Sequence, residues 1–542
     1  REAVVSLEER AHVRTEVARE YFEREHGREP ADARELASAV ALYSRPKTTA
    51  VAGYDLTFSP VKSVSTLWAV ADPATAAAIE RAHNAAVKDA LAFIEREALY
   101  TRTGTNGVRQ VDVRGLVATA FTHRDSRAGD PDLHTHVAVA NKVQTAKDGM
   151  WLAIDGRLMF QATVAASEAY NTALERHLEA SLGVRFEERE NTDRRKRPVR
   201  EIVGVDPRLN ERWSTRRQSI EERRDVLVAK FHADHGRPPT AVEAVQLAQQ
   251  ATLETRDVKH EPRSMPEQRA QWAEQATGVL GVRGLEQMVT TALRPAPLSA
   301  QAAADRRVDA AWIGRVAGRV VEGVQDRRST WNRWNLISEA QRHVRRSDVP
   351  ADQVQHLVNL VVDQAIATCQ PLGVVDDSVT EPEQLQRRDG ASVYTVVGAT
   401  LYTSPRILAA EQRIVEAAGF HDRHRVTPVD VDLALLESAA NGVELNAGQD
   451  AMVRGMATSG ARVQLGIAAA GTGKTTAMRV LTRAWETSGG SAIGLAPSAA
   501  AAAALREQTG TTTDTLAKLV DSLQRGTGGA LVDQIGAGTL VV

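Results

Sequence analysis

The sequence predicts three regions of different fold class: an α+β domain with an antiparallel sheet, a mainly helical region, and the start of a parallel α/β domain. Two β-branched, apolar runs at 108–124 and 133–146 flank the turn-rich stretch "DSRAGDPD", which is typical of an antiparallel hairpin. From residue 441 onward, strand and helix patterns alternate instead, as they do in a parallel sheet. At 542 residues the chain is too long for one core, and we expect domains at 1–265, 266–440 and 441–542.

The composition is that of an ordinary globular protein, with 43% hydrophobic and 25% charged residues. Because the formal net charge is only −2, any nucleic acid would have to be bound by local basic patches. Cys369 is the sole cysteine, which excludes an intrachain disulfide and favours a reducing, cytoplasmic compartment. No apolar run approaches the roughly 18 residues of a membrane span, so we expect no membrane insertion.

The two ends of the sequence predict a piece of a longer protein. The chain opens with Arg1 rather than methionine, and it stops inside the apolar run "GAGTLVV". A finished domain rarely ends on a hydrophobic strand without a polar tail. We therefore expect an internal fragment.

The first region contains the clearest element patterns. Residues 1–46 predict two helices that meet after Gly27. The β-branched stretch 49–70 is interrupted by a proline, which predicts a strand followed by a second element. A helix is expected at 73–99, and another long helix follows "MWLAIDGRLMF" and ends near residue 181.

The later patterns are weaker until the last region. The middle region predicts helices and a short strand pair around "ASVYTVVGATLYTS". One internal similarity, "EHGREPADARELA" against "DHGRPPTAVEAVQLA", predicts two similar helix–turn–helix corners, because the copies do not continue into a periodic array.

Three histidines lie within the predicted hairpin, in "HRDSRAGDPDLHTH" at 123–136. Side chains alternate faces along a strand, so His134 and His136 point the same way, about 7 Å apart. If the preceding strand pairs antiparallel with theirs, His123 joins them on one face. Three neutral imidazoles leave coordination positions open, as in a catalytic site where a divalent cation polarises a phosphate oxygen. A surface hairpin that merely carries histidines and a zinc-type hydrolytic site are the alternatives at this point.

A basic patch follows in the stretch "DRRKRPVR". Such a cluster neutralises phosphates and releases counterions. Further arginines lie near Trp213, which we expect to stack a base. A solvated charged face is the alternative. The candidate DNA contacts are Arg194, Arg195, Lys196, Arg197, Arg216 and Arg217.

The segment "AAAGTGKTT" at 468–476 follows the apolar run "VQLGI", which predicts a strand, and precedes a helix pattern. A phosphate-binding loop needs glycines in the turn between strand and helix, followed by Lys and Ser or Thr. Backbone N–H groups of such a loop cradle phosphates, Lys474 reaches the β and γ phosphates, and Thr475 coordinates Mg²⁺. The strict pattern asks for glycine where this chain has Ala468. The candidate nucleotide contacts of the loop are Gly471, Thr472, Gly473, Lys474 and Thr475.

Two motifs carry a family resemblance. "GYDLTFSPVKSVS" at 53–65, together with "HRDSRAGDPDLHTHVAVAN" at 123–141, strongly resembles the relaxase domain of the conjugative relaxase–helicase family, the TrwC/TraI-like or MobF group. The resemblance covers roughly residues 1–260. It implies an α+β relaxase domain whose antiparallel sheet carries an HUH-type histidine hairpin. It also implies nicking of one DNA strand at a plasmid transfer origin.

The resemblance implies roles for four residues. In that family three histidines bind a divalent metal, here Mg²⁺, Mn²⁺ or Zn²⁺, that holds the scissile phosphate. Those histidines are His123, His134 and His136 in this chain. The family's aspartate in "DLTF", here the catalytic candidate Asp55, orients a ligand or helps to activate the nucleophile.

The family's nucleophile is a tyrosine upstream of "DLTF", and the product is a covalent phosphotyrosine bond. Tyr21 and Tyr43 are the tyrosines that precede Tyr54, the residue before "DLTF", and both fall in predicted helices. We therefore expect the nucleophile to lie upstream of Arg1.

A second resemblance covers the end of the chain. "GTGKTT", with "LNAGQDAMV" upstream, resembles the opening of a RecD-like superfamily 1 helicase, whose RecA-like domain binds ATP with Mg²⁺ and whose glutamine, here Gln449, reads adenine. "GLAPSAAAAAAL" is similar to the next helicase motif, which touches single-stranded DNA. ATP hydrolysis also needs an acidic strand end, and no Asp-Glu pair follows residue 476. We expect nucleotide binding without ATPase activity or unwinding by this chain.

Together these observations predict a bacterial conjugative relaxase fused to a helicase. The expected partners are single-stranded plasmid DNA at the transfer origin and a coupling protein of a type IV secretion system. One alternative is a catalytically incomplete metal- and DNA-binding fragment, and another is a nickase of the replication-initiator or transposase type. A metal-dependent hydrolase of small substrates leaves the phosphate loop and "DLTFSPVKSVS" unexplained.

Overall fold

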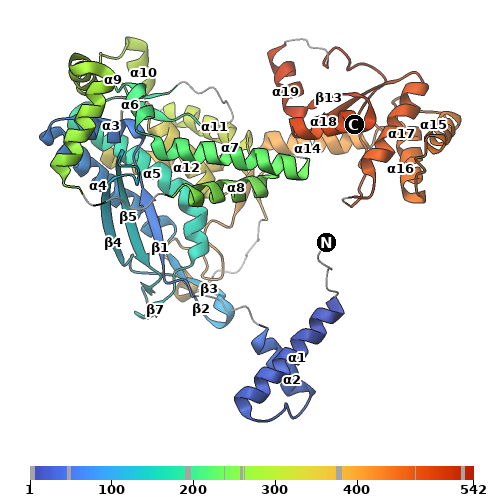
Figure 1. Ribbon diagram of the computed structural model, residues 1–542, viewed down its shortest axis with the longest axis horizontal. Coiled ribbons are helices and arrows are strands. Elements are labelled where there is room, and N and C mark those ends of the chain that lie inside the picture. Colours follow the sequence, from blue (N-terminus) through green and yellow to red (C-terminus); the bar gives the residue numbers. More distant parts are fainter. Residues whose placement is uncertain are drawn as a thin grey trace.

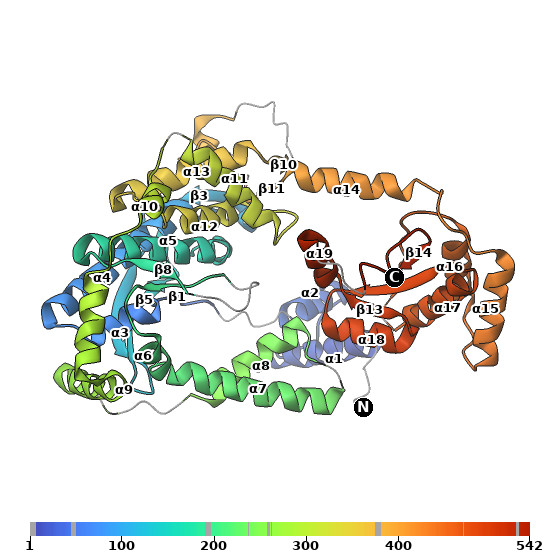
Figure 2. The ribbon, with the colours of Figure 1, turned by 90° about the horizontal axis from the view of Figure 1, so that it is seen from above.

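The chain folds into a mixed α/β body, a helical hairpin that stands apart from it, and a second α/β unit at the C-terminal end (Figure 1). The helix 405–418 leads from the body to this second unit, and Figure 2 shows it spanning the space between them. The histidine motif belongs to the first body and the phosphate-loop motif to the second unit. The computed structural model describes residues 7–44, 50–189, 197–236, 238–256, 261, 263–309, 311–373, 381–469, 471–526 and 531–542.

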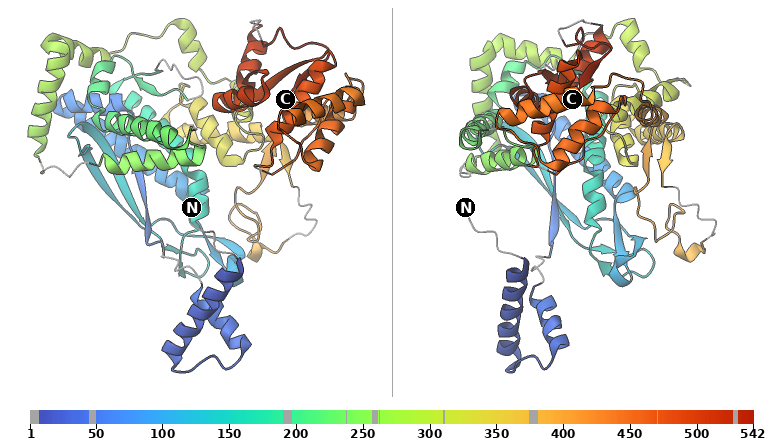
Figure 3. Two further views of the ribbon diagram at one scale, coloured as in Figure 1. Left: turned by 45° about the vertical axis from the view of Figure 1, so that its right-hand side comes forward. Right: turned by 90° about the vertical axis from the view of Figure 1, so that its right-hand side faces the viewer.

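The separate hairpin consists of α1 (Leu7–His26) and α2 (Ala33–Tyr43), as the sequence predicts. Gly27 ends α1 with a φ of 66°, which glycine adopts without strain. The Asp32 side chain caps α2 by accepting a hydrogen bond from the N–H of Glu35. Figure 3 shows this hairpin projecting away from the body.

A second helical hairpin, formed by α7 (Thr215–His235) and α8 (Ala241–Glu254), turns between its helices in the same way as α1 and α2. Gly236 follows α7 with a φ of 65°, like the glycine that ends α1. The Phe231–His235 rings stack with centroids 4.1 Å apart, and the Phe22–His26 rings do the same at 4.1 Å. The two predicted helix–turn–helix corners are confirmed.

The sheet that carries the histidines has the antiparallel strand order β1–β5–β4, formed by β1 (Gly53–Phe58), β5 (Pro131–Ala140) and β4 (Ala118–Asp125). Along β5, Leu133, Thr135, Val137 and Val139 are buried on one face, and the alternate residues, His134 and His136 among them, lie on the opposite, more open face. The buried face shares one core with α3 (Lys62–Val70), α4 (Pro73–Glu97) and α5 (Gly156–Leu182). The predicted strand, hairpin and two long helices are therefore confirmed.

The core of this body extends into α9 (Met265–Leu293), beyond the domain boundary that we expect at residue 265. Trp272 on α9 is fully buried, and its ring centroid lies 5.5 Å from that of Trp68. Its Nε1–H donates to the carbonyl of Gly129, in the turn between β4 and β5, at 2.9 Å. The shorter elements of the body are β2 (Tyr100–Thr103), η1 (Thr105–Gly107), β3 (Arg109–Asp112), β6 (Val143–Gln144), β7 (Trp151–Leu152), β8 (Phe186–Glu188), β9 (Arg200–Ile202) and α6 (Pro207–Arg212).

A second core joins the helical middle region to the same body. α11 (Trp312–Gln325), α12 (Arg333–Val344) and α13 (Val354–Ala367) bury apolar side chains together with parts of α4 and α5. Fully buried Leu336 and Val358 meet Leu158 of α5 in this core. The other elements are α10 (Ala300–Arg306), η2 (Ala351–Gln353), β10 (Gln370–Leu372), η3 (Glu383–Leu385), β11 (Leu401–Thr403) and α14 (Pro405–Ala418).

The strand pair predicted around "ASVYTVVGATLYTS" is wrong in its first half. β11 pairs antiparallel with β10, which comes earlier in the chain. The stretch 391–400 forms turns instead. The buried Arg387 guanidinium donates to the carbonyls of Ser392 and Thr395, and these hydrogen bonds stabilise the turns.

The C-terminal unit contains a parallel sheet of order β13–β12–β14, which confirms the predicted strand–helix alternation. The strand predicted at "VQLGI" is wrong: residues 463–467 form no strand, and Leu465 and Ile467 are 84% and 93% exposed. None of the described helices is long and apolar enough to cross a membrane. The unit comprises α15 (Pro428–Ala440), α16 (Ala447–Thr458), α17 (Lys474–Thr487), β12 (Ser491–Ala496), α18 (Ala499–Thr509), β13 (Thr512–Thr515), α19 (Leu516–Arg525) and β14 (Thr539–Val541).

Candidate metal centre and phosphate loop

Three histidine rings meet on the open face of the β1–β5–β4 sheet. His123 of β4 is directly opposite His134 of β5, and His136 is two residues further along β5. The ring centroids are 5.2 Å apart for His123–His134 and 5.3 Å apart for the other two pairs. The antiparallel pairing that the sequence requires for a three-histidine face is therefore present.

This spacing suits a shared metal ion. An ion bound about 2.0–2.1 Å from three imidazole nitrogens lies about 3.2 Å from each ring centre, and tetrahedral directions then separate the centres by about 5.2 Å. As the side chains lie, no three His, Cys, Asp or Glu side chains of the described segments are arranged to hold an ion without movement. The ring centres already have the separation that a shared ion requires.

The second nitrogen of two of these rings is fixed by an acceptor. Nδ1 of His134 lies 2.7 Å from the carbonyl oxygen of Asp132, which can only accept, so this Nδ1 carries the proton. Nδ1 of His136 lies 2.9 and 3.0 Å from the two carboxylate oxygens of Asp55 on β1. In its neutral form each of these two rings therefore presents an unprotonated Nε2, the form in which imidazole binds a metal.

His83 supports β5 from its other face. This histidine of α4 is fully buried, with Nε2 2.7 Å from the hydroxyl of Thr135 and Nδ1 2.8 Å from the hydroxyl of Tyr170. Burial, together with the nearby His134, lowers the pKa of His83 to about 4, so it stays neutral. It therefore fixes the strand segment that carries two of the candidate ligands.

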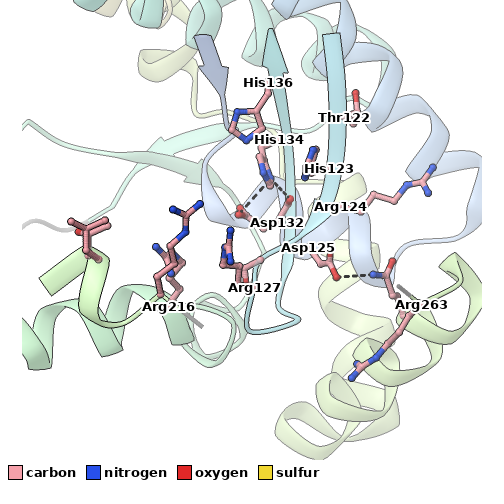
Figure 4. A pocket seen from close by; sticks show the side chains of 15 residues that line it. Thr122, His123, Arg124, Asp125, Arg127, Asp132, His134, His136, Arg216 and Arg263 are labelled. Atoms are coloured by element: carbon pink, nitrogen blue, oxygen red, sulfur yellow. Dashed lines mark hydrogen bonds and ion pairs between the residues drawn. The ribbon is translucent and has the colours of Figure 1, made fainter. Parts of the chain in front are cut away.

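The rings open into a cavity of ≈ 810 Å³ (Figure 4). It is bordered by the β4–β5 turn, the two helices of the second hairpin and the start of α9. Nη1 of Arg216 is buried with no hydrogen-bond partner among the described residues, although the residue lines this cavity. The arginines in its lining are Arg124, Arg127, Arg216, Arg256 and Arg263.

The predicted DNA contacts that the structure describes differ in their surroundings. Arg194, Arg195 and Lys196 lie outside the described residues. Arg197 forms an ion pair with Glu339, and Arg217 pairs with Glu221 at 2.9 Å, whereas Arg216 lines the cavity. The expected base-stacking role of Trp213 is wrong, because this ring is fully buried and its Nε1–H donates to Gln275 at 2.7 Å.

Sequence reasoning missed several residues of the site. Lys62 follows the "DLTF" strand, and its ammonium donates to the carbonyl of Pro131 at 2.8 Å, where burial lowers its pKa. The position of Lys62 inside the quoted motif is a signal that it contributes. His83 gives no such signal, because a histidine among apolar helix positions also occurs in ordinary cores.

The phosphate loop leads into α17. Gly473 takes a φ of 75° at the helix start, and Lys474 donates to the carbonyls of Ala468 and Ala469 at 2.9 and 2.6 Å. Gln449, at the start of α16, donates its amide hydrogen to the carbonyl of Thr472 at 2.8 Å. The structure thus brings the predicted glutamine against the loop. Gly471 takes a φ of 77°, and Thr475 lies in the first turn of α17.

Comparison with known proteins matches a family model to each of the two regions that carry these motifs. The family model described as TrwC relaxase matches residues 2–279, and the model described as AAA domain matches residues 444–542. A multifunctional conjugation protein TraI of Escherichia coli is 35% identical over 181 residues, which cover 30% of this chain and 10% of that protein. TraI of Escherichia coli strain K12 is 41% identical over 100 residues, covering 18% of this chain and 5% of that protein.

Solved structures of similar proteins include the conjugative relaxase TrwC in complex with oriT DNA. Its metal-free form is 29% identical with a TM-score of 0.36, covering 44% of this chain and 77% of that chain. The metal-bound form is also 29% identical, with a TM-score of 0.36. The match covers 44% of this chain and 75% of that chain. This chain spans a tenth or less of the length of the two TraI proteins. Because the relaxase model matches more than half of its residues, the chain belongs to the TrwC relaxase family.

Proposed function

We propose that this chain carries the metal-binding centre of a conjugative relaxase, which cleaves single-stranded DNA at a plasmid transfer origin by transesterification. The observation that carries the proposal is the set of three rings 5.2–5.3 Å apart, two of them with Nδ1 held by an acceptor. Mg²⁺, Mn²⁺ or Zn²⁺ is the proposed ion, since imidazole suits several divalent cations. When bound, the ion would polarise the scissile phosphate.

The residues of this chain perform the positioning in that reaction. His123, His134 and His136 would hold the ion, and Asp55 keeps the His136 ring in the tautomer that binds it. Arg216 and Arg127 line the same cavity and would take the phosphates of the strand on either side of the cleaved bond.

A second candidate function is metal and strand binding without cleavage by this chain alone. The reaction needs a tyrosine nucleophile, and no tyrosine is among the described residues that line the cavity. Tyr54 of β1 lies on the opposite face from Asp55, against Gly156. Tyr21 and Tyr43 belong to the separate hairpin, where their rings contact each other at 5.7 Å. We therefore assign the nucleophile to none of these three residues.

For the C-terminal unit we propose a RecA-like nucleotide site that binds ATP with Mg²⁺. Lys474 and Thr475 would contact the phosphates and the ion, and Gln449 would read the adenine. The resemblance to a RecD-like helicase supports coupling of strand cleavage to unwinding in a longer protein. A type IV coupling protein as partner and a bacterial cytoplasmic location complete this proposal.

A strand-capture experiment tests the proposal and separates the two candidates. The chain would be incubated with radiolabelled random single-stranded 30-mers and Mn²⁺, then analysed on native and denaturing gels. The native gel should show metal-enhanced binding that H134A and R216E weaken and that H177A, a histidine paired with Asp89 on the surface, leaves unchanged. A band that survives denaturation supports cleavage with covalent attachment, and its absence supports binding alone. Strand binding that is unchanged in both H134A and R216E would contradict both candidate functions.

A further inference from the structure

A second cavity, of ≈ 340 Å³, lies where α5, α12 and the strands β8 and β9 meet. It shares no lining residue with the histidine cavity. Six arginines and four glutamates among its lining residues leave a formal excess of two positive charges. The arginines are Arg197, Arg200, Arg327, Arg342, Arg345 and Arg346.

All four glutamates are already engaged by these arginines. Glu168 accepts from Arg342 at 2.6 Å and also pairs with Arg345. Glu175 accepts from Arg200 at 2.9 Å and lies 3.7 Å from Arg345.

The remaining two glutamates are paired as well. Glu339 accepts from Arg342 at 2.8 Å and pairs with Arg197, and Glu188 pairs with Arg346. Five of the arginines therefore share four carboxylates, so this network holds one more guanidinium than it has carboxylates.

The excess charge is partly withdrawn from water. Arg345 is 8% exposed, and its Nε has no hydrogen-bond acceptor among the described residues. Burial lowers the pKa of the Arg346 guanidinium, and Arg200 and Arg345 also lower it, whereas Glu188 raises it. Because these guanidiniums share their carboxylates and a buried N–H of Arg345 has no acceptor among the described residues, an anion that enters this cavity is stabilised.

We propose that this cavity binds a phosphate group, either on a free nucleotide or within a nucleic-acid strand. Arginine presents a planar fork of donors that matches two phosphate oxygens, and clustered arginines favour phosphate over chloride for that reason. The volume equals roughly eleven water molecules at about 30 Å³ each, which leaves room for a sugar beside the phosphate. The proposal does not depend on the function of the histidine site.

One ion pair at the edge of the cavity provides a matched test. Arg346 and Glu188 pair with each other, and their side chains are 47% and 37% exposed, so either is replaced without emptying a core. R346Q and E188Q break the same ion pair, but R346Q lowers the excess positive charge and E188Q raises it. A merely structural role for the pair predicts the same effect for both variants.

The measurement is calorimetric titration of the 542-residue chain with inorganic phosphate at constant ionic strength. EDTA removes divalent ions, and a K474A background removes the phosphate-loop lysine from the signal. We expect R346Q to raise the Kd about tenfold and E188Q to lower it by a similar factor. Equal changes in both variants, or no phosphate binding in the K474A chain, would overturn the proposal.

Competition identifies the source of the phosphate. A mononucleotide and a single-stranded 20-mer would each be titrated against phosphate-loaded chain in the same background. Displacement by the 20-mer at lower concentration identifies a strand phosphate, and displacement by the mononucleotide at lower concentration identifies a free nucleotide. A failure of both to displace phosphate would contradict the proposed ligand class. H134A leaves these results unchanged, which separates this site from the proposed relaxase centre.

Discussion

The Asp55 carboxylate of β1 and Nδ1 of His136 on β5 lie 2.9 Å apart across two paired strands. The aspartate is 61% exposed at its side chain, so no core packing explains its position. The contact fixes which nitrogen of His136 carries the proton and leaves the other nitrogen for a metal.

Replacing Asp55 with Asn should weaken binding of Mn²⁺ or Zn²⁺ about 10–100-fold, because the amide no longer fixes the basic tautomer of His136. Calorimetric titration of the ion measures this. D89N is the matched control: Asp89 is 55% exposed at its side chain and lies 2.7 Å from Nε2 of His177, outside the cavity. Equal ion affinity in D55N and D89N would remove Asp55 from the site.

Replacing Trp272 with Ala should destabilise the chain by roughly 3–5 kcal/mol, because the ring is fully buried in the core of the histidine sheet. The lost hydrogen bond to Gly129 also frees the β4–β5 turn, so ion affinity should fall. Urea unfolding and ion titration measure the two effects. W151A, at a tryptophan that is 54% exposed, should change neither. A W272A chain as stable as W151A would mean that α9 folds separately from the sheet.

Acid should destabilise the fold in part through His343. Burial lowers the pKa of this imidazole to about 4 in the folded chain, against about 6.5 in an unfolded chain. As the pH falls, His343 is therefore protonated in the unfolded chain before it is protonated in the folded chain. The stability due to neutral His343 is complete above pH 6.5 and is lost as the pH falls to 4. Between pH 7 and 4 the parent chain should lose ~3 kcal/mol more than H343Q, as measured by urea unfolding. Parallel pH profiles for the two chains would rule this contribution out.

Replacing Gly473 with Ala should abolish binding of a fluorescent ATP analogue. Its φ of 75° strains any side chain, and the added Cβ would collide with Nε2 of Gln449. Gly526 offers a control, since it has a similar φ of 62° at the end of α19 but open space around its Cβ position. G526A should bind the analogue like the parent chain. Unchanged binding by G473A would show that the loop does not need this backbone geometry.

The sequence was sufficient for the parts of the site that lie on one strand or one hairpin. Alternation along "LHTH" places His134 and His136 on one face, and antiparallel pairing adds His123, because both rules are local. Asp55 follows from the family motif, and the register of β1 against β5 then brings it to His136.

The rest depends on packing between distant segments. Trp213 lies in a run of arginines, which predicts an exposed ring, but tertiary contacts with α9 bury it. Arg216 and Arg263 border the histidine cavity because a helical hairpin and α9 converge on the β4–β5 turn, which no local pattern reveals. The run "VQLGI" has the composition of a strand and forms none, because no strand of the described sheet pairs with it.

The most direct test of the central claim is the X-ray absorption spectrum of the purified chain loaded with Zn²⁺. The account predicts one ion per chain, coordinated by three imidazoles at about 2.0–2.1 Å, with the imidazole count falling to two in H134A. An ion with fewer than three imidazoles in the parent chain, or a spectrum that H134A leaves unchanged, would contradict it.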